Sequence, residues 1–180
     1  MSDDGMMIAS IARLVAIARG TVDDYAGPGA PVNADQVRAL LAASGCHVEI
    51  FPFRSDAAGM TLPLCEGVHP VLVNGAAVGM ETGFALRHQV AHVLAGNPSG
   101  AVCLAAEGYE RHAERLADLF ALADAVPGRW ILGMVGERRS WEAVRGEIAR
   151  CIAELAPAWP ADRLHDRADL RLRLFRECGI

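Results

Sequence analysis

An apolar stretch over residues 84–96 constrains the fold more than any other part of the sequence. As a helix it would be apolar on nearly every side, which predicts a buried helix that ends near Gly96. His88 and His92 are four residues apart and so lie one turn apart on the same face of that helix. Two imidazoles at this spacing can bind one zinc ion, although buried histidines are also satisfied by carbonyl or carboxylate groups. The stretch therefore indicates either a metal centre or a core with two hydrogen-bonded histidines.

A third protein ligand for such a metal can come from the helix predicted over residues 109–125. Glu114 and Asp118 lie one turn apart there, with apolar neighbours such as Leu119 and Phe120. A carboxylate in an apolar stretch needs a partner, so a purely solvated helix face is the weaker interpretation. We expect Glu114 to bind the metal and Asp118 to accept the N–H of a ligating histidine.

Other zinc patterns are less well matched by the sequence. The metzincin extension needs a glycine at position 95 and a histidine at position 98, where this chain has Ala95 and Pro98, and the inverted H-x-x-E-H pattern is absent. Three rival third ligands remain: Glu107, Glu110 and His112.

Composition limits the classes of function. At 180 residues, 52% hydrophobic and 22% charged, the chain can form one domain with a sizeable core. A net charge of −5 argues against a nucleic-acid coat, and the basic residues 167–176 alternate with leucines as in a packed amphipathic helix. The five cysteines are scattered, which indicates free thiols rather than a disulfide framework. The acidic residues 1–4 and the lack of a long apolar run predict a cytoplasmic protein without a membrane partner.

The order of predicted elements indicates an α+β fold. A helix over 6–19 and a loop would form an N-terminal part, residues 1–30, before a domain over 31–180. In that domain, a helix over 34–44 with Asn33 as its N-cap is followed by a small, mostly antiparallel, three-stranded sheet. The predicted strands are residues 47–51, 59–62 and 71–74, and residues 96–108 are expected to form a loop. Further helices are predicted over residues 109–125, 130–135, 141–155 and 161–177.

The two histidine and carboxylate motifs together resemble those of the ImmA/IrrE family of zinc metallopeptidases. The family motif H-E-L-G-H corresponds to H-Q-V-A-H at residues 88–92, and E-x-E-A-N/D-x-F-A corresponds to E-R-L-A-D-L-F-A at residues 114–121. The similarity covers roughly residues 31–180. It implies a compact zincin-like fold with one zinc per chain, and limited proteolysis of a specific protein substrate, often a DNA-binding repressor. Direct nucleic-acid binding is not expected.

Gln89 is the departure that matters most, because it replaces the family's general-base glutamate. In such sites zinc polarises the scissile carbonyl and lowers the pKa of bound water, and the glutamate takes the water's proton. Glutamine keeps a hydrogen bond but cannot take the proton, so peptide hydrolysis should be very slow or absent. Three interpretations follow: a peptidase whose glutamate was deliberately replaced, which we favour slightly; a natural zinc-binding pseudopeptidase; and a metal-free interaction domain. Candidates for oxyanion stabilisation are Tyr109, His112 and His165.

Overall fold

The computed structural model describes most of the chain. The described residues are 3–21, 34–54, 57–62, 67–75, 82–95, 101–104, 112–157 and 159–179. Within them the fold is α+β, as the sequence predicts. In chain order the elements are α1 (Asp3–Thr21), α2 (Ala34–Ala43), β1 (Cys46–Phe51), β2 (Ala57–Thr61), β3 (His69–Asn74), α3 (Thr82–Leu94), β4 (Ala101–Leu104), α4 (His112–Ala125), α5 (Gly128–Gly136), α6 (Trp141–Leu155) and α7 (Ala161–Cys178).

The sheet is mixed and has the strand order β1-β3-β2-β4. β1 runs parallel to β3, whereas β2 is antiparallel to both β3 and β4. The three predicted strands are present, but the predicted loop over 96–108 was wrong in part because it contains β4. That strand is only four residues long and follows closely on Asn97, Pro98 and Gly100, whose turn preference dominated the sequence pattern.

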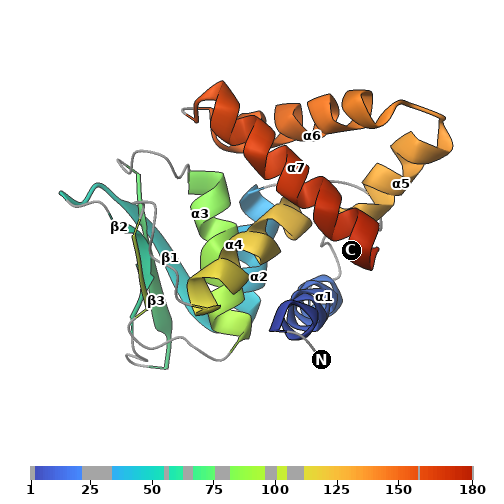
Figure 1. The fold of residues 1–180 in the computed structure, drawn as a ribbon. Coiled ribbons are helices and arrows are strands. Elements are labelled where there is room, and N and C mark those ends of the chain that lie inside the picture. The colour runs from blue at the N-terminus through green and yellow to red at the C-terminus, as the bar shows by residue number, and fades with distance from the viewer. Residues whose placement is uncertain are drawn as a thin grey trace.

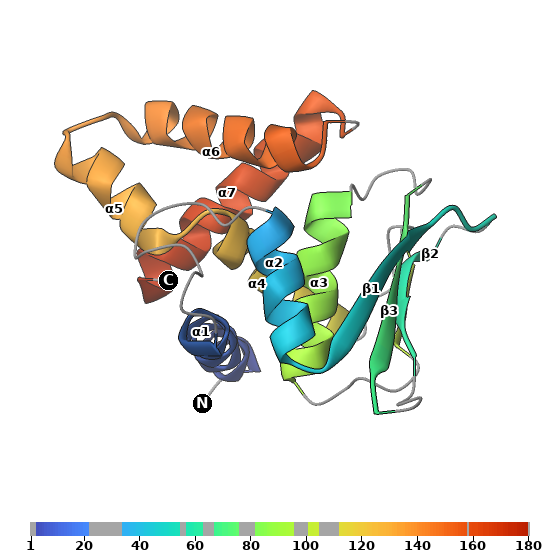
Figure 2. The ribbon, with the colours of Figure 1, turned by 180° about the vertical axis from the view of Figure 1, so that it is seen from behind.

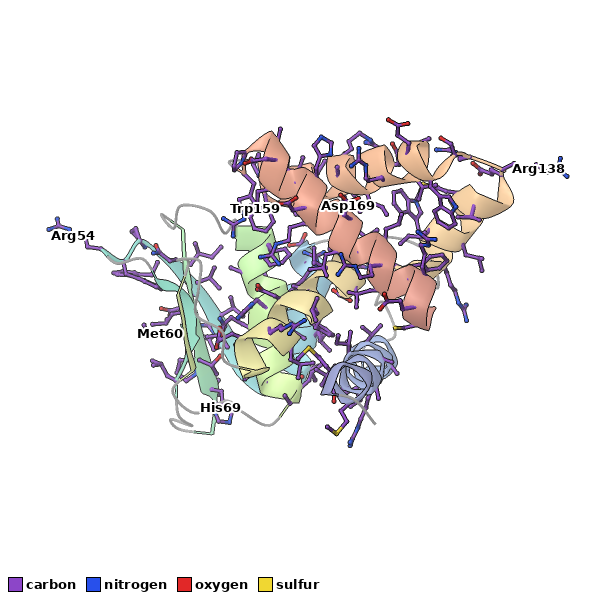
Figure 3. The ribbon with its side chains drawn as sticks, in the orientation of Figure 1. Arg54, Met60, His69, Arg138, Trp159 and Asp169 are labelled. Carbon is purple, nitrogen blue, oxygen red and sulfur yellow. The ribbon has the colours of Figure 1, made fainter. Side chains whose placement is uncertain are left out.

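One face of the sheet is covered by helices. α2 and α3 lie directly against it, and the remaining helices pack behind them (Figures 1 and 2). Val71 and Val73 of β3 point into this layer and are fully buried. Met60 of β2 lies on the opposite face of the sheet, away from the helices (Figure 3). Strand alternation therefore divides the sheet into a core face and an outer face.

Helix ends follow local sequence signals where the structure describes them. Gly45 adopts a left-handed φ of 75° directly after α2, and its N–H donates to the Ala42 carbonyl. That conformation suits glycine, so the predicted end of this helix is confirmed. Ser140 caps α6 by accepting from the N–H of Ala143 at 3.2 Å. The predicted cap Asn33 and the predicted stop Gly96 lie outside the described residues.

The C-terminal helix α7 packs through its leucines as predicted, but one of its basic residues is buried rather than exposed to solvent. Leu172 and Leu174 are buried, but so is Arg171, whose Nε donates to the Val126 carbonyl at 2.7 Å. This contact joins α7 to the end of α4. α1 also packs on α4, where Met7 and Ile11 share an apolar cluster with Leu119.

Among the described residues, no single helix combines the length and apolarity needed to cross a membrane. α4 and α5 pass such a test only as a pair, and the two meet at a bend of 47°.

Candidate metal centre

The two histidines of α3 are held together inside the molecule. α3 lies between the sheet and α4, so its side chains contact protein on most sides (Figure 1). His88 and His92 are each only 2% exposed, and their ring centroids are 4.9 Å apart. The Nε2 atoms of the two rings face each other at 3.1 Å. The one-turn spacing in the sequence therefore produces a convergent pair of nitrogen atoms.

α4 supplies the carboxylates. One Glu114 oxygen lies 3.1 Å from Nε2 of His88, and the other lies 3.4 Å from Nε2 of His92. One turn along the helix, Oδ1 of Asp118 lies 2.9 Å from Nδ1 of His88. Glu114 thus meets the metal-binding side of the imidazoles, and Asp118 meets the opposite nitrogen of His88.

The three converging side chains have the spacing of a tetrahedral metal site. Ligand atoms placed ~2.0–2.1 Å from a zinc ion at tetrahedral angles are about 3.3–3.4 Å apart. Here the two Nε2 atoms are 3.1 Å apart, one Glu114 oxygen lies 3.1 Å from Nε2 of His88, and the other Glu114 oxygen lies 3.4 Å from Nε2 of His92. His88, His92 and Glu114 form a group that can hold a metal ion.

The proton positions also favour a cation between these side chains. Asp118 accepts from Nδ1–H of His88, so Nε2 of a neutral His88 carries a lone pair. This lone pair faces a Glu114 oxygen and Nε2 of His92, both at 3.1 Å. A proton added to Nε2 can point at only one of these partners, whereas a metal ion interacts with both at once. The donor set therefore fits a divalent cation.

Glu114 enters this group as an anion. Burial by itself raises the pKa of its carboxyl, but hydrogen bonds from His88 and His92, which those imidazoles donate when they are protonated, and the positive charge that they then carry outweigh burial. The net effect holds the pKa of Glu114 well below its usual range. Glu114 is therefore a carboxylate at neutral pH, as a metal ligand must be.

Gln89 is held against the sheet. It is 1% exposed, and its Oε1 accepts a hydrogen bond from the Thr61 hydroxyl of β2 at 2.8 Å. Gly59, two residues earlier on the same strand, leaves the space for this side chain, because a Cβ there would lie 3.0 Å from Gln89 Nε2 and 2.9 Å from the Leu72 carbonyl oxygen. β2 therefore fixes the conformation of residue 89.

A buried ion pair joins the two helices that carry the ligands. Arg87 Nε lies 3.3 Å from an Asp124 carboxylate oxygen, and both side chains are fully buried. Arg87 also donates to the Gly83 carbonyl at 2.8 Å. This pair was not predicted from the sequence, although a charged residue within each of two apolar helices was a usable signal. Thr61 carried no comparable signal.

Among the side chains that the structure describes, no other predicted site residue belongs to this group. Glu107, Tyr109 and Glu110 lie outside the described residues, and His112 is described only as the first residue of α4. His165 is exposed on α7.

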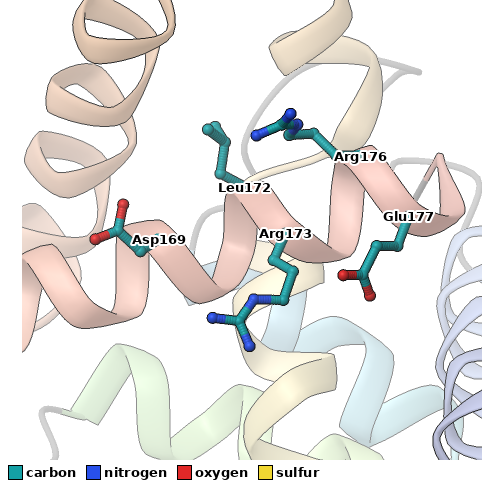
Figure 4. Close-up of a pocket in the computed structure, with 5 residues that line it drawn as sticks. All are labelled: Asp169, Leu172, Arg173, Arg176 and Glu177. Atoms are coloured by element: carbon teal, nitrogen blue, oxygen red, sulfur yellow. The ribbon is translucent and has the colours of Figure 1, made fainter.

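A separate surface hollow of about 520 Å³ lies along α7 (Figure 4). Its described lining residues are Asp169, Leu172, Arg173, Arg176 and Glu177. Two acidic and two basic side chains balance each other there, and the hollow shares no described residue with the metal group.

Comparison of the chain with protein-family models, curated proteins and solved structures gives no match. The assignment of a metal centre therefore depends on its geometry. The resemblance to the ImmA/IrrE family depends on the two motifs that carry His88, His92 and Glu114.

Proposed function

We propose that this chain is a zinc-binding domain of the metallopeptidase type, similar to the ImmA/IrrE family, which acts on a protein or peptide. The observation that carries the proposal is the convergence of His88, His92 and Glu114 in one buried group. The contact between Asp118 and His88 supports it, because ligating histidines commonly donate their other N–H to a carboxylate. Two nitrogen ligands and one carboxylate leave the fourth position of a tetrahedral zinc open, which is typical of catalytic sites.

Residue 89 determines what such a site can do. A zinc ion bound by these side chains would act as a Lewis acid toward a substrate carbonyl and a water molecule. Gln89 follows His88 directly and is held in place by Thr61, so its side chain can orient a neighbouring group through hydrogen bonds. It cannot accept a proton and become a neutral acid. Loss of a general base costs about 10²–10⁴-fold in rate, so we expect the chain to retain substrate binding and to hydrolyse peptides very slowly or not at all.

A natural pseudopeptidase is the second candidate. Gln89 is not the only departure from the family motif, because Ala91 stands for its glycine and Leu116 for its second acidic residue. Ala91 is buried and Leu116 packs on the core, so both departures are integrated into the fold. These accommodated changes support the natural pseudopeptidase as the second candidate. Both candidates share the metal centre and differ in whether restoring glutamate restores cleavage.

Metal analysis tests the shared part of the proposal. Purified protein should contain about one zinc per chain by elemental analysis, and added zinc should raise its melting temperature, because the unfolded chain lacks the site. His88→Ala should abolish both effects. His165→Ala removes an exposed histidine and should change neither. Wild-type protein that carries no zinc and gains no stability from it would leave the metal-free interaction domain as the remaining interpretation.

Cleavage assays separate the two candidates. The protein with Gln89 and its Gln89→Glu variant would be incubated with candidate protein substrates, including DNA-binding repressors, with and without a chelator. If the chain is a peptidase that lacks only its general base, the Gln89→Glu variant should cleave the substrate and the Gln89 form should not. A chelator should stop that cleavage. Tight binding of a partner by both forms, without cleavage, would support the pseudopeptidase. Equal cleavage by both forms would show that the base lies elsewhere.

A further inference from the structure

Asp118 contacts two helices through its two carboxylate oxygens. Oδ1 lies 2.9 Å from Nδ1 of His88 on α3, and Oδ2 lies 3.5 Å from a guanidinium nitrogen of Arg167 on α7. The Arg167 side chain is 25% exposed and that of Asp118 is 27% exposed, so water screens this ion pair only in part. A chain of three charged or polar groups thus runs from α7 to the proposed zinc ligand.

The backbone of α7 is well placed to hold Arg167 at this position. Arg171 lies one helical turn further along the same face and is anchored to the Val126 carbonyl at the end of α4. Leu174 packs in one apolar cluster with Leu119 and Ala123 of α4. α7 crosses over α4 as a result (Figure 1). Arg167 thereby comes within 3.5 Å of Asp118.

We propose that Arg167 is a positioning residue for the metal centre and that the C-terminal helix α7 thereby contributes to metal affinity. This inference rests on the proposed zinc site. A carboxylate held between His88 and a cation keeps its orientation toward Nδ1–H of His88. This orientation keeps the imidazole ring turned so that Nε2 faces the metal position. Removing the guanidinium lets the Asp118 carboxylate rotate into water.

Zinc affinity of Arg167→Gln, measured by competition with a chelator, is the first test. Because Asp118 remains in this variant, its zinc affinity should fall less than that of Asp118→Asn. The expected loss is about two- to five-fold, as for a partly exposed ion pair. Arg145→Gln is the matched control, because Arg145 makes an ion pair of the same 3.5 Å length with Asp169 on α7. That control should bind zinc like the wild type.

A double-mutant cycle distinguishes a route through Asp118 from general destabilisation. Arg167→Gln should weaken zinc binding in the wild-type background and have no further effect when Asp118→Asn is already present. Equal losses in both backgrounds would overturn the proposal, since Arg167 would then act independently of Asp118.

The NMR resonances of the histidine imidazoles provide a second measurement, which would not change if Arg167 had only a structural role. In zinc-loaded protein labelled at histidine, the Nδ1–H proton of His88 should be shifted in Arg167→Gln and unchanged in Arg145→Gln. If the wild type binds zinc and Arg167→Gln has the same affinity and the same resonance, the role of Arg167 is refuted and the metal centre stands. Absence of zinc binding by the wild type would instead refute the metal centre.

Discussion

Replacing Asp118 with asparagine tests how the proposed metal ligand His88 is supported. The amide keeps an oxygen that can accept from Nδ1–H, at the position where Asp118 now lies 2.9 Å away. It loses the negative charge that strengthens the donor power of the imidazole. Loss of such a partner typically weakens metal binding about 10–100-fold.

The consequence for stability follows from mass action. At a free zinc concentration 100 times the wild-type Kd, binding stabilises the fold by about 2.7 kcal/mol, and a 10–100-fold weaker site gives only about 1.4–0.4 kcal/mol. The zinc-induced gain should therefore fall by about 1.3–2.3 kcal/mol, which corresponds to roughly 3–9 °C in melting temperature for a chain of this size.

Thermal unfolding in zinc-buffered solutions, with and without chelator, measures this difference directly. Asp169→Asn is the control, because Asp169 forms an ion pair with Arg145 on the surface and touches no proposed ligand. The Asp118→Asn and control proteins should melt alike without metal. A zinc-induced gain in Asp118→Asn equal to that of the wild type would show that Asp118 does not support the metal centre.

Three further predictions concern the surroundings of the site. Asp124→Ala leaves Arg87 buried without its carboxylate and should lower the free energy of unfolding by about 3–5 kcal/mol in urea denaturation, whereas a loss below 1 kcal/mol would contradict a buried pair. Thr61→Val removes the hydroxyl that donates to Gln89 Oε1 and should cost about 1–3 kcal/mol in the same assay, and no loss would mean that this hydrogen bond is dispensable. Zinc affinity should fall as the pH is lowered, because protons compete with zinc for the imidazole nitrogens, while the lowered pKa of Glu114 keeps that ligand ionised. Affinity that begins to fall only below pH 4.5 in zinc titrations would assign the limiting protonation to a carboxylate instead.

The local parts of the site were predictable because helical spacing is a local property. Four-residue spacing placed His88 with His92 and Glu114 with Asp118 before any tertiary structure was known. The structure brings these two pairs together, with Asp118 at the outer nitrogen of His88. The roles of these residues at a metal ion stay predictions. Apolar character alone indicated that the histidine helix is buried.

The tertiary partners were not predictable from one sequence. The contacts of Thr61 with Gln89 and of Arg167 with Asp118 join residues 28 and 49 positions apart in the numbering, and no periodic pattern links them. They depend on how β2 and α7 pack on α3 and α4. β4 was missed for a related reason, because its four residues gain their strand conformation from pairing with β2.

Anomalous X-ray scattering tests the central claim most directly. Data collected from crystals of zinc-loaded protein above and below the zinc absorption edge would locate the ion without reference to any assigned role. If these side chains bind zinc, one strong difference peak per chain will lie within about 2.0–2.2 Å of Nε2 of His88, Nε2 of His92 and a Glu114 oxygen. A peak elsewhere, or no peak between these three side chains in zinc-loaded crystals, would contradict it.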